Sequence, residues 1–388
     1  MADVKTELKF RLTLVLTIIV ATSAARSEAQ NATFASTDDA TRKTAAALGF
    51  GDAPSLAFET ATFEPPTASC HSATSAPLAD GRLFVAWYGG SREGARDVAI
   101  YGATLTPRGE ASEPRVLLDR RRLSRDVWRS IRKLGNPVVY AQDERLFLFV
   151  TSVSYGGWSG SSLNVATSDD GGETWSRFRR LRTTPLFNVS SLVRAAAVPR
   201  SDGGFLLPAY CESATKYGLA LAFDASGRLV DRAKTPIAEN ARALQPTIVP
   251  LSARRASAFL RVEEGGVGVS ESLDGGATWR PRPRLPLDNP NASVAAALAD
   301  DGRLVLVGNP GDGGRSRLLV WTADPTDLTR WTEVATLENE PDCEFSYPFL
   351  TRWNGELCVV YTWKRKAIKA ANLTAILRSG AKTEGESK

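Results

Sequence analysis

One short pattern recurs six times along the chain and constrains its fold more than any other feature. Each copy is a turn followed by a strand-like run rich in Val, Leu and Phe. The copies are LADGRLFVAW, AQDERLFLFV, RSDGGFLLPAY, SARRASAFLR, ADDGRLVLVGN and RWNGELCVVYTW. Four of the six turns contain Asp-Gly or Asn-Gly, which supply the positive φ angles of a tight hairpin. A repeat of about 40 to 50 residues is typical of propellers and solenoids.

Each apolar strand is followed by a second, more polar hairpin. The corresponding segments are DVAIYGATL, SLNVATS, YGLALAF, VGVSES, RLLVWTA and AIKAANL. Four strands in each of six repeats predict an all-β fold, a six-bladed β-propeller with four-stranded antiparallel blades. A two-sheet sandwich would also contain many short strands, but it would not explain the regular repeat.

Two of the outer hairpins contain the pattern S-x-D-x-G-x-T-W, at residues 168–175 and 272–279, and TADPTDLTRW near Trp331 is a degenerate third copy. In such a turn the carboxylate accepts hydrogen bonds from backbone amides and the tryptophan packs between sheets. The pattern therefore predicts a structural role, on the outside of the second and fourth blades.

The ends of the chain differ from the repeats. Lys5, Lys9 and Arg11 precede the apolar run LTLVLTIIVATSAA, which predicts a secretory signal peptide over residues 1–29, or an uncleaved anchor in its place. We expect a poorly ordered leader over 30–65, the propeller over 66–377 and a disordered tail over 378–388. No later apolar stretch reaches about 18 residues, so we expect no membrane span after signal cleavage.

The formal charge is +5, and scattered arginines carry most of it. We interpret this as a generally basic surface, not as a nucleic-acid site. Cys70, Cys211, Cys343 and Cys358 lack zinc-finger spacing, and we expect neither a metal nor another cofactor. A disulfide between Cys70 and Cys343 would join the first and last blades.

Four N-x-S/T sequons begin at Asn31, Asn188, Asn291 and Asn372, which suits a glycoprotein that passes through the secretory pathway. Asn291 falls on the predicted mouth of the central channel, so we expect it to be unmodified. Asn188 and Asn372 are candidates for glycosylation.

The repeat also predicts which side chains surround that mouth, because residues that enter the first strand of a hairpin and residues that leave the second lie opposite the turn. The entering residues are His71, Asn136, Arg194, Gln245, Asn291 and Tyr347. The leaving residues are Arg92, Glu93, Asp97, Trp158, Glu212, Arg261, Arg315, Tyr361 and Trp363. Charged donors, carboxyls and flat rings around one channel are typical of sugar recognition.

Over about residues 65–377 the chain resembles the sialidase (neuraminidase) superfamily, in its bacterial-type Asp-box branch. The segments that carry the resemblance are SCHSATSAPLADGRLFVAWYGGSREG, NPNASVAAALADDGRLVLVGNP and FSYPFLTRWNGELCVVYTW. The resemblance implies an exo-acting glycosidase with a tyrosine nucleophile, an activating glutamate, an aspartate acid/base and three arginines that bind a substrate carboxylate. Tyr347 matches the nucleophile, Asp97 the acid/base, and Arg261 and Arg315 two of the arginines.

Two positions depart from the family pattern. His71 replaces the first arginine, so the carboxylate is bound more weakly or in another geometry. Gln245 replaces the activating glutamate and cannot accept a proton. Arg194 could supply a positive field instead, and Glu212 a base.

Three functions therefore remain open. The leading one is hydrolysis of a terminal acidic sugar from a glycan by a secreted monomer, with Asp97, Tyr347 and Glu212 as catalytic candidates. The second is glycan binding without catalysis. The third is elimination on a uronate polysaccharide, with Tyr347 and His71 as acid and base. Each of these residues could instead have a structural role. Asp97 could cap a turn, Tyr347 could be a ring of the core, and Glu93 and Glu212 could form salt bridges.

Overall fold

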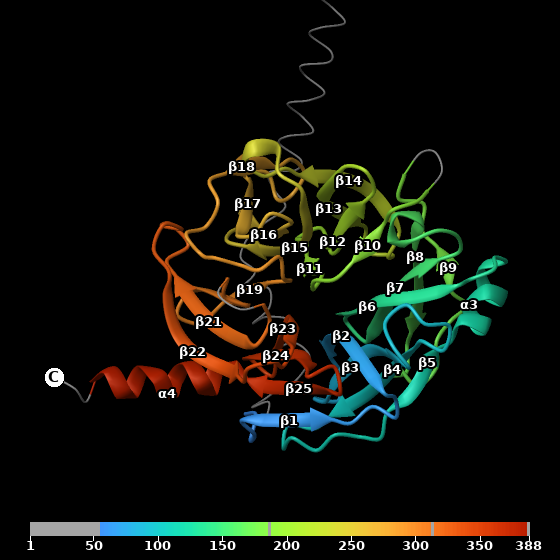
Figure 1. Ribbon diagram of the computed structural model, residues 1–388, viewed down its shortest axis with the longest axis horizontal. Helices are drawn as coiled ribbons and strands as arrows, with labels where there is room; N and C mark the ends of the chain where they lie inside the picture. Colours follow the sequence, from blue (N-terminus) through green and yellow to red (C-terminus); the bar gives the residue numbers. More distant parts are fainter. Residues whose placement is uncertain (1–54, 185–187, 312–313, 386–388) are drawn as a thin grey trace, which may run out of the picture.

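Six antiparallel sheets surround a common axis in the computed structural model, which describes residues 55–184, 188–311 and 314–385 (Figure 1). Each sheet forms one blade. Blade 1 contains β2 (Ser69–Pro77), β3 (Leu83–Gly90), β4 (Ala99–Leu105) and β5 (Arg115–Leu118). Blade 2 contains β6 (Lys133–Gln142), β7 (Arg145–Val153), β8 (Ser161–Ser168) and β9 (Arg179–Arg180). The helix α3 (Arg120–Val127) connects these two blades.

The remaining blades repeat the plan. Blade 3 has an inner strand broken into β10 (Leu192–Val193) and β11 (Val198–Pro199), followed by β12 (Phe205–Glu212), β13 (Lys216–Phe223) and β14 (Leu229–Thr235). Blade 4 contains β15 (Ala243–Pro250), β16 (Ala256–Val262), β17 (Val267–Ser272) and β18 (Arg280–Arg282). Blade 5 contains β19 (Ala295–Leu298), β20 (Leu304–Gly308), β21 (Arg317–Ala323) and β22 (Thr332–Asn339).

Blade 6 is assembled from both ends of the described chain. It contains β23 (Phe345–Trp353), β24 (Glu356–Trp363) and β25 (Ala367–Asn372), and its outer strand is β1 (Thr60–Phe63), which pairs with β25. Phe63 is buried, with its ring 5.7 Å from that of Trp87 in blade 1. The ring of blades is thus closed by hydrogen bonds between distant segments.

These strands confirm the six-bladed propeller. All six repeated turns join the first two strands of a blade, and Gly81 and Gly302 have φ angles of 83° and 81°, which a residue with a Cβ adopts only at a cost. Two expected boundaries need correction. The strand β1 lies inside the segment 30–65 expected to be a leader, and the helix α4 (Leu373–Gly385) occupies most of the expected disordered tail.

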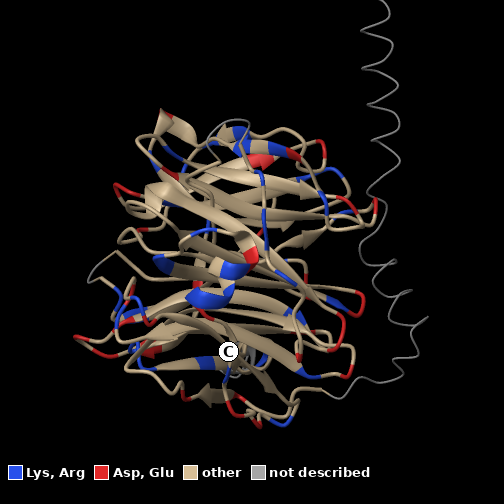
Figure 2. Ribbon diagram, turned by 90° about the vertical axis from the view of Figure 1, so that its right-hand side faces the viewer, with Lys and Arg blue, Asp and Glu red and all other residues tan. Residues whose placement is uncertain are grey.

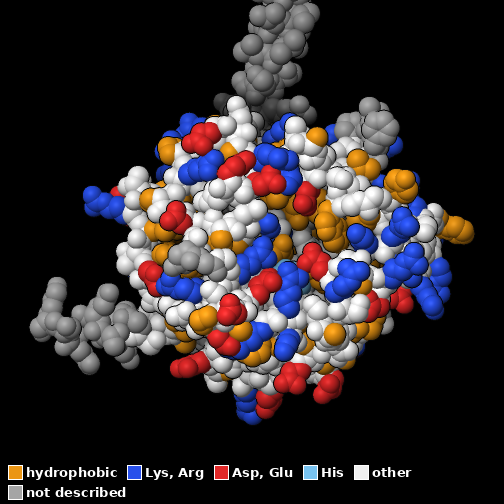
Figure 3. Space-filling model, in the orientation of Figure 1, with side chains coloured by type: hydrophobic (Ala, Val, Ile, Leu, Met, Phe, Trp, Pro, Cys, Tyr) orange, Lys and Arg blue, Asp and Glu red, His pale blue; other side chains and the backbone are white. Residues whose placement is uncertain are grey.

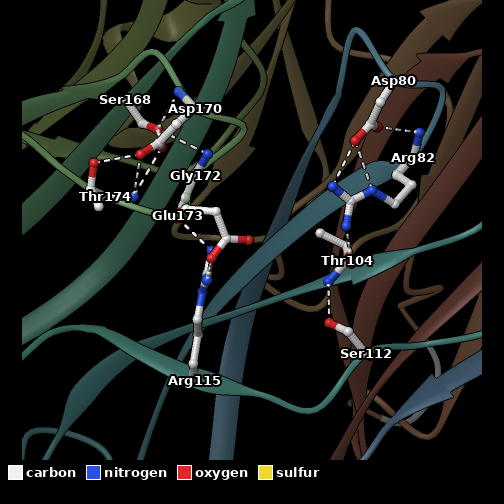
Figure 4. Close-up of polar contacts among 10 residues, drawn as sticks. All are labelled: Asp80, Arg82, Thr104, Ser112, Arg115, Ser168, Asp170, Gly172, Glu173 and Thr174. Carbon is white, nitrogen blue, oxygen red and sulfur yellow. Dashed lines mark hydrogen bonds and ion pairs between the residues drawn. The ribbon is translucent and has the colours of Figure 1, made fainter.

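The first Asp box connects β8 to β9, as predicted for the second blade (Figure 4). Asp170 accepts hydrogen bonds from the backbone N of Thr174 at 2.9 Å and from Ser168 Oγ at 2.7 Å. Ser168 Oγ in turn accepts from Gly172 N at 2.8 Å. The second box makes the same bonds between β17 and β18 of blade 4. These side chains satisfy turn amides, so their role is structural.

The degenerate third copy keeps part of this geometry. Trp331 Nε1 donates to the carbonyl of Leu328 at 3.0 Å, as Trp279 Nε1 donates to that of Gly276 at 3.0 Å in the second box. Figure 4 also shows a contact between blades at the first box, where Arg115 Nη2 of β5 donates to the carbonyl of Gly172 at 2.6 Å. The outer turns therefore join neighbouring blades as well as neighbouring strands.

The possible disulfide between Cys70 and Cys343 is not formed, since all four cysteines are free. Cys70 lies in the apolar core between blades, where burial raises the pKa of its thiol to about 12. Cys343 lies in the connection before β23, and its thiol donates to Glu340 at 3.2 Å. Hydrogen bonds between β1 and β25 close the ring of blades instead.

Asn372 is not a suitable glycosylation site. Its side chain is buried, and its amide donates to Glu356 at 2.6 Å and accepts from Ala375 N at 3.1 Å. Asn31 and the predicted signal peptide lie outside the described residues. In the part of the chain that the structure describes, no helix is long and apolar enough to cross a membrane.

Closure by β1 generates a test of stability. Phe63→Ala should lower the free energy of unfolding by about 3 kcal/mol or more, because it leaves a cavity where a buried ring packs. Thr62→Ala, on the exposed face of the same strand, should change it by less than about 0.5 kcal/mol. Urea denaturation followed by tryptophan fluorescence measures both, and equal small losses would show that blade 6 is stable without β1.

Candidate functional site

The inner strands of several blades are irregular at one level, near their first residues. The pairing register shifts after His71 in β2, after Leu134 in β6, after Leu244 in β15 and after Ser346 in β23. Immediately after three of these points the backbone has a positive φ, 60° at Ser72, 51° at Gln245 and 58° at Tyr347, and Asn291 ahead of β19 has φ 55°. Positive φ is uncommon for residues other than glycine and often marks functional positions.

The side chains at this level meet across the axis. Gln245 Nε2 of blade 4 donates to the hydroxyl of Tyr347 in blade 6 at 3.3 Å and to the hydroxyl of Tyr210 in blade 3 at 3.3 Å. The guanidinium of Arg261 donates to Gln245 Oε1 at 3.3 Å. Because blades 4 and 6 are not neighbours, these groups can meet only at the centre of the ring.

Two asparagines extend this arrangement, which we call the central cluster. Asn136 Nδ2 donates to the hydroxyl of Tyr210 at 3.3 Å, and Arg261 Nε donates to Asn291 Oδ1 at 2.6 Å. The cluster comprises His71, Asn136, Arg194, Tyr210, Gln245, Arg261, Asn291, Arg315 and Tyr347. It therefore brings together all six predicted entering residues, one from each blade.

Arg194 is the deeply buried member of the cluster. Its guanidinium donates to the carbonyls of Ala73 at 3.1 Å, of Pro348 at 3.0 Å and of Tyr347, and it lies 4.9 Å from the centre of the Tyr347 ring. No carboxylate among the described residues pairs with it, and burial lowers its pKa to about 10. A blade 3 side chain thus holds the backbone of blades 1 and 6 and the left-handed conformation of Tyr347.

His71 is also buried, and its ring centre lies 4.1 Å from that of Tyr347. Neither ring nitrogen has a hydrogen-bond partner among the described residues. Burial, together with positive charges of which Arg365 is the foremost, holds the pKa of His71 well below its usual value. The imidazole is therefore neutral at physiological pH and does not replace the missing arginine as a cation.

Sequence reasoning missed Arg365 and Glu344, which lie beside this ring. Glu344 accepts from Arg315 at 3.1 Å and from Arg365 Nε at 2.8 Å, and Arg365 Nη1 donates to Glu93 at 2.8 Å. Arg315 lies 5.6 Å from the centre of the Tyr347 ring. The only signal in the sequence was position, because Glu344 precedes the SYPFL segment and Arg365 follows Trp363. This row of charges ties the loop after β3 to blades 5 and 6.

The two candidate acid/base residues have different surroundings. Asp97 is exposed and accepts hydrogen bonds from Ser91 N at 2.8 Å and Ser91 Oγ at 2.9 Å, which lower the pKa of its carboxyl. Glu212 is half-buried at the end of β12, and desolvation raises the pKa of its carboxyl. The turn thus favours the ionised form of Asp97, whereas burial favours the protonated form of Glu212.

Tyr361 must be removed from the site. It is buried between blades 5 and 6, where its hydroxyl donates to Glu338 of the outer strand β22 at 2.7 Å. Arg92 is exposed on the loop after β3. Trp158 packs beside Tyr210 and under the amine of Lys133, 5.9 Å from its ring, and Trp363 lies under Lys364 at 4.5 Å.

The central cluster is cationic and rich in phenols, a combination suited to binding a carboxylate and a sugar ring. Figure 3 shows acidic and basic side chains gathered around the centre of this face. A surface depression at the turns of blades 1 and 2 is instead lined by carboxylates such as Asp80, Asp143 and Asp170, which would repel an acidic sugar. Among the described residues no group of His, Cys, Asp and Glu side chains could hold a metal ion.

Arg194 generates a prediction about the scaffold. Arg194→Met fills a similar volume but leaves three carbonyl oxygens unpaired, so we expect it to lower the free energy of unfolding by about 2 kcal/mol or more. The matched variant Arg330→Met alters a side chain that is 89% exposed and should cost less than about 0.5 kcal/mol. Denaturant titration compares them, and indistinguishable midpoints would contradict a stabilising role for the hydrogen bonds from Arg194 to these carbonyls.

Glu212 generates a prediction about pH. Because burial raises the pKa of this carboxyl in the folded state, its contribution to stability is full below the pKa of the unfolded chain and is lost as the pH rises through the higher folded value. Glu212→Gln should therefore be more stable than the parent at pH above neutrality and lose that advantage in mild acid. Thermal melts across pH measure this, with the exposed Glu113→Gln as control. A stability difference between Glu212→Gln and the parent that does not change with pH would contradict a raised pKa for this carboxyl.

Comparisons with known proteins agree with the geometry. Residues 81–359 match the family model of the BNR repeat-like domain. No curated protein sequence matches the chain. Among solved structures, Hadza microbial sialidase Hz136 is similar with a TM-score of 0.64 and 15% identity, over 80% of this chain and 66% of that one.

In two further structures, nearly the whole of the other protein's chain is matched. The intramolecular trans-sialidase from Ruminococcus gnavus in complex with oseltamivir carboxylate has a TM-score of 0.64 and 15% identity, over 80% of this chain and 96% of that one. A protein of unknown function from Dyadobacter fermentans has a TM-score of 0.65 and 13% identity, over 81% and 97%. At such identities the likeness concerns the fold. The family model spans most of the propeller, and the chain therefore belongs to the BNR repeat-like domain family, as a sialidase-like propeller.

Proposed function

We propose that the central cluster binds a terminal acidic sugar and that the protein hydrolyses its glycosidic bond as an exo-acting, sialidase-type glycosidase. One observation carries this proposal, the convergence of Arg261, Arg315 and the Tyr347 hydroxyl on one space at the axis. The guanidinium groups suit a substrate carboxylate, and the phenol suits attack at the adjacent anomeric carbon. The names of similar structures, sialidases and trans-sialidases, support the same class.

In the proposed reaction the oxygen of Tyr347 forms a bond to the anomeric carbon while the glycosidic C–O bond breaks, and a carboxyl group donates its proton to the leaving oxygen. Water then attacks the anomeric carbon as the bond to the Tyr347 oxygen breaks. The carboxylate that donated to the leaving group takes a proton from that water, and the tyrosine oxygen regains its own proton from the group that had accepted it. Gln245 holds the phenol oxygen through its Nε2 but cannot take its proton. The phenol proton therefore needs another acceptor, and the half-buried Glu212 is our candidate.

Two residues are candidates for the proton donor. Asp97 holds the family position, but its hydrogen bonds from Ser91 favour its ionised form. It would act as a proton donor only after a movement of this loop broke those hydrogen bonds. Glu212 already has a raised pKa from burial, which suits a general acid. Glu212 cannot both accept the phenol proton and donate to the leaving oxygen in the same step. We therefore assign the two carboxyls opposite roles, one as acceptor of the phenol proton and the other as donor to the leaving oxygen, and substrates with good and poor leaving groups decide which is the donor.

A second candidate function is elimination on a uronate, and the contact between His71 and Tyr347 favours it. The neutral imidazole of His71 would remove the proton beside the carboxylate, a C=C bond would form as the C–O bond at the next carbon breaks, and the Tyr347 hydroxyl would protonate the leaving oxygen. Arginines would neutralise the substrate carboxylate. A third outcome is glycan binding without turnover.

We propose that the protein acts outside the cell as a monomer. The apolar run over residues 12–25 after Lys5, Lys9 and Arg11 supports secretion. The partner we propose is an acidic glycan or oligosaccharide, with no nucleic acid.

Three variants test the mechanism. Tyr347→Phe should reduce hydrolysis of a fluorogenic acidic glycoside by about a thousandfold or more while binding changes little, since only the reacting oxygen is removed. Tyr361→Phe, which removes a hydroxyl outside the site, should retain activity. Gln245→Glu supplies a carboxylate beside the phenol and should raise activity or shift the pH optimum.

The products decide among the candidate functions. New reducing ends without ultraviolet absorbance indicate hydrolysis, whereas an absorbing unsaturated uronate indicates elimination. Hydrolysis that survives Tyr347→Phe would exclude the tyrosine nucleophile, and saturable binding without either product would identify a glycan-binding propeller.

A further inference from the structure

The connection between blades 1 and 2 concentrates positive charge on one edge of the ring. Residues 120–133 contain six arginines, one lysine and a single carboxylate. In Figure 2, where the side that carries α3 faces the viewer, Lys and Arg positions dominate that helix, and Figure 3 shows basic side chains on the same side. The structure thus gathers cations that the sequence analysis treated as scattered. We call residues 120–133 the basic rim.

Only some of these basic side chains form hydrogen bonds that stabilise the fold. Asp119 caps α3 by accepting from Arg122 N at 2.6 Å, and the helix is anchored through the buried Leu123. Arg122 also donates to the carbonyls of Leu117 and Trp175 at 3.0 and 2.8 Å. Its side chain therefore has a structural role, as does that of Arg120, which donates to the carbonyl of Ile131 at 3.4 Å.

The other arginines of the basic rim have no such role. Arg121, Arg125, Arg129 and Arg132 are exposed, and none forms an ion pair with a described residue. Four unneutralised cations on one edge repel one another and attract an extended polyanion. Charge complementarity therefore points to an acidic polymer.

Exposed aromatic rings accompany these cations. Trp128 is 85% exposed with φ 53°, and the guanidinium of Arg177 lies 5.9 Å from its ring centre. Tyr155, on the loop between β7 and β8, is 83% exposed. Large rings exposed to water, one of them next to a guanidinium group, offer the flat apolar surface on which sugar rings stack.

The basic rim is continuous with the central cluster. Lys133 ends the rim, lies near Gly94 of the loop that carries Glu93, and lies over the ring of Trp158. Trp158 packs on Gly135, next to Asn136 of the cluster. A chain that leaves the centre in this direction would pass from the cluster over Trp158 and Lys133 to α3.

We propose that the basic rim binds the anionic chain of an acidic polysaccharide whose terminal sugar occupies the central cluster. The class of ligand rests on the proposed function, while the binding surface is separate from the catalytic residues. The rim thereby selects polymers over short acidic glycosides. Anionic membranes and nucleic acids are the competing polyanions.

The test removes charge from the rim alone. Arg121→Ser/Arg125→Ser/Arg129→Ser, in the full chain, should weaken binding to polygalacturonate or to α2,8-linked polysialic acid by about tenfold or more at low salt, with a smaller difference at high salt. Trp128→Ala should weaken binding at both salt concentrations, because stacking is not screened. Turnover of a small fluorogenic acidic glycoside should be unchanged in both variants.

The matched control Arg108→Ser/Arg254→Ser/Arg330→Ser removes the same charge from exposed positions elsewhere, and its affinity should fall by less than about threefold. Equal losses in both triple variants for both polymers would overturn the proposal, as would a rim-dependent affinity for phosphatidylserine vesicles or single-stranded DNA that exceeds the affinity for both polysaccharides. Absence of small-substrate turnover in every variant would instead refute the proposed function and leave the rim result intact. Thermal melts confirm that each variant is folded.

Discussion

The closure of the ring by β1 is the constraint on which the rest of the molecule depends. Six twisted sheets can surround a common axis only if the last blade joins the first, and hydrogen bonds between Thr60–Phe63 and β25 make that join. The buried contact of Phe63 with Trp87 adds apolar packing across the seam. Since strands from both ends of the described chain form one sheet, opening the seam would release both at once.

Closure also creates the candidate site, because it brings six inner strands within side-chain reach of one another. Arg194 uses this convergence to bind carbonyls of two other blades. A buried cation with only neutral partners is costly, which suggests that the geometry it imposes on Tyr347 compensates in function. The positive φ angles at Gln245 and Tyr347 are also uncommon for residues other than glycine. They accompany the register shifts at which these two side chains leave the sheet pattern and meet near the axis.

The electrostatics of the site follow from the same crowding. Burial, together with positive charges of which Arg365 is the foremost, lowers the pKa of His71, while Glu344 and Glu93 fix the direction of Arg365 and balance part of the charge. An incoming carboxylate would therefore meet oriented guanidinium groups at little further ordering cost. The two carboxyls at the periphery differ because Ser91 stabilises ionised Asp97, whereas burial disfavours ionised Glu212.

The amino-acid sequence by itself determined the blades and the six entering positions, because turn dipeptides, alternating apolar strands and Asp boxes are local patterns that repeat. It could not exclude Tyr361, since the direction of a side chain at the end of a strand depends on the neighbouring blade that covers it. It also could not place β1 or Arg365, whose roles come from contacts between residues far apart in the chain. Local periodicity encodes the strands, whereas closure of the ring decides which side chains meet at its centre.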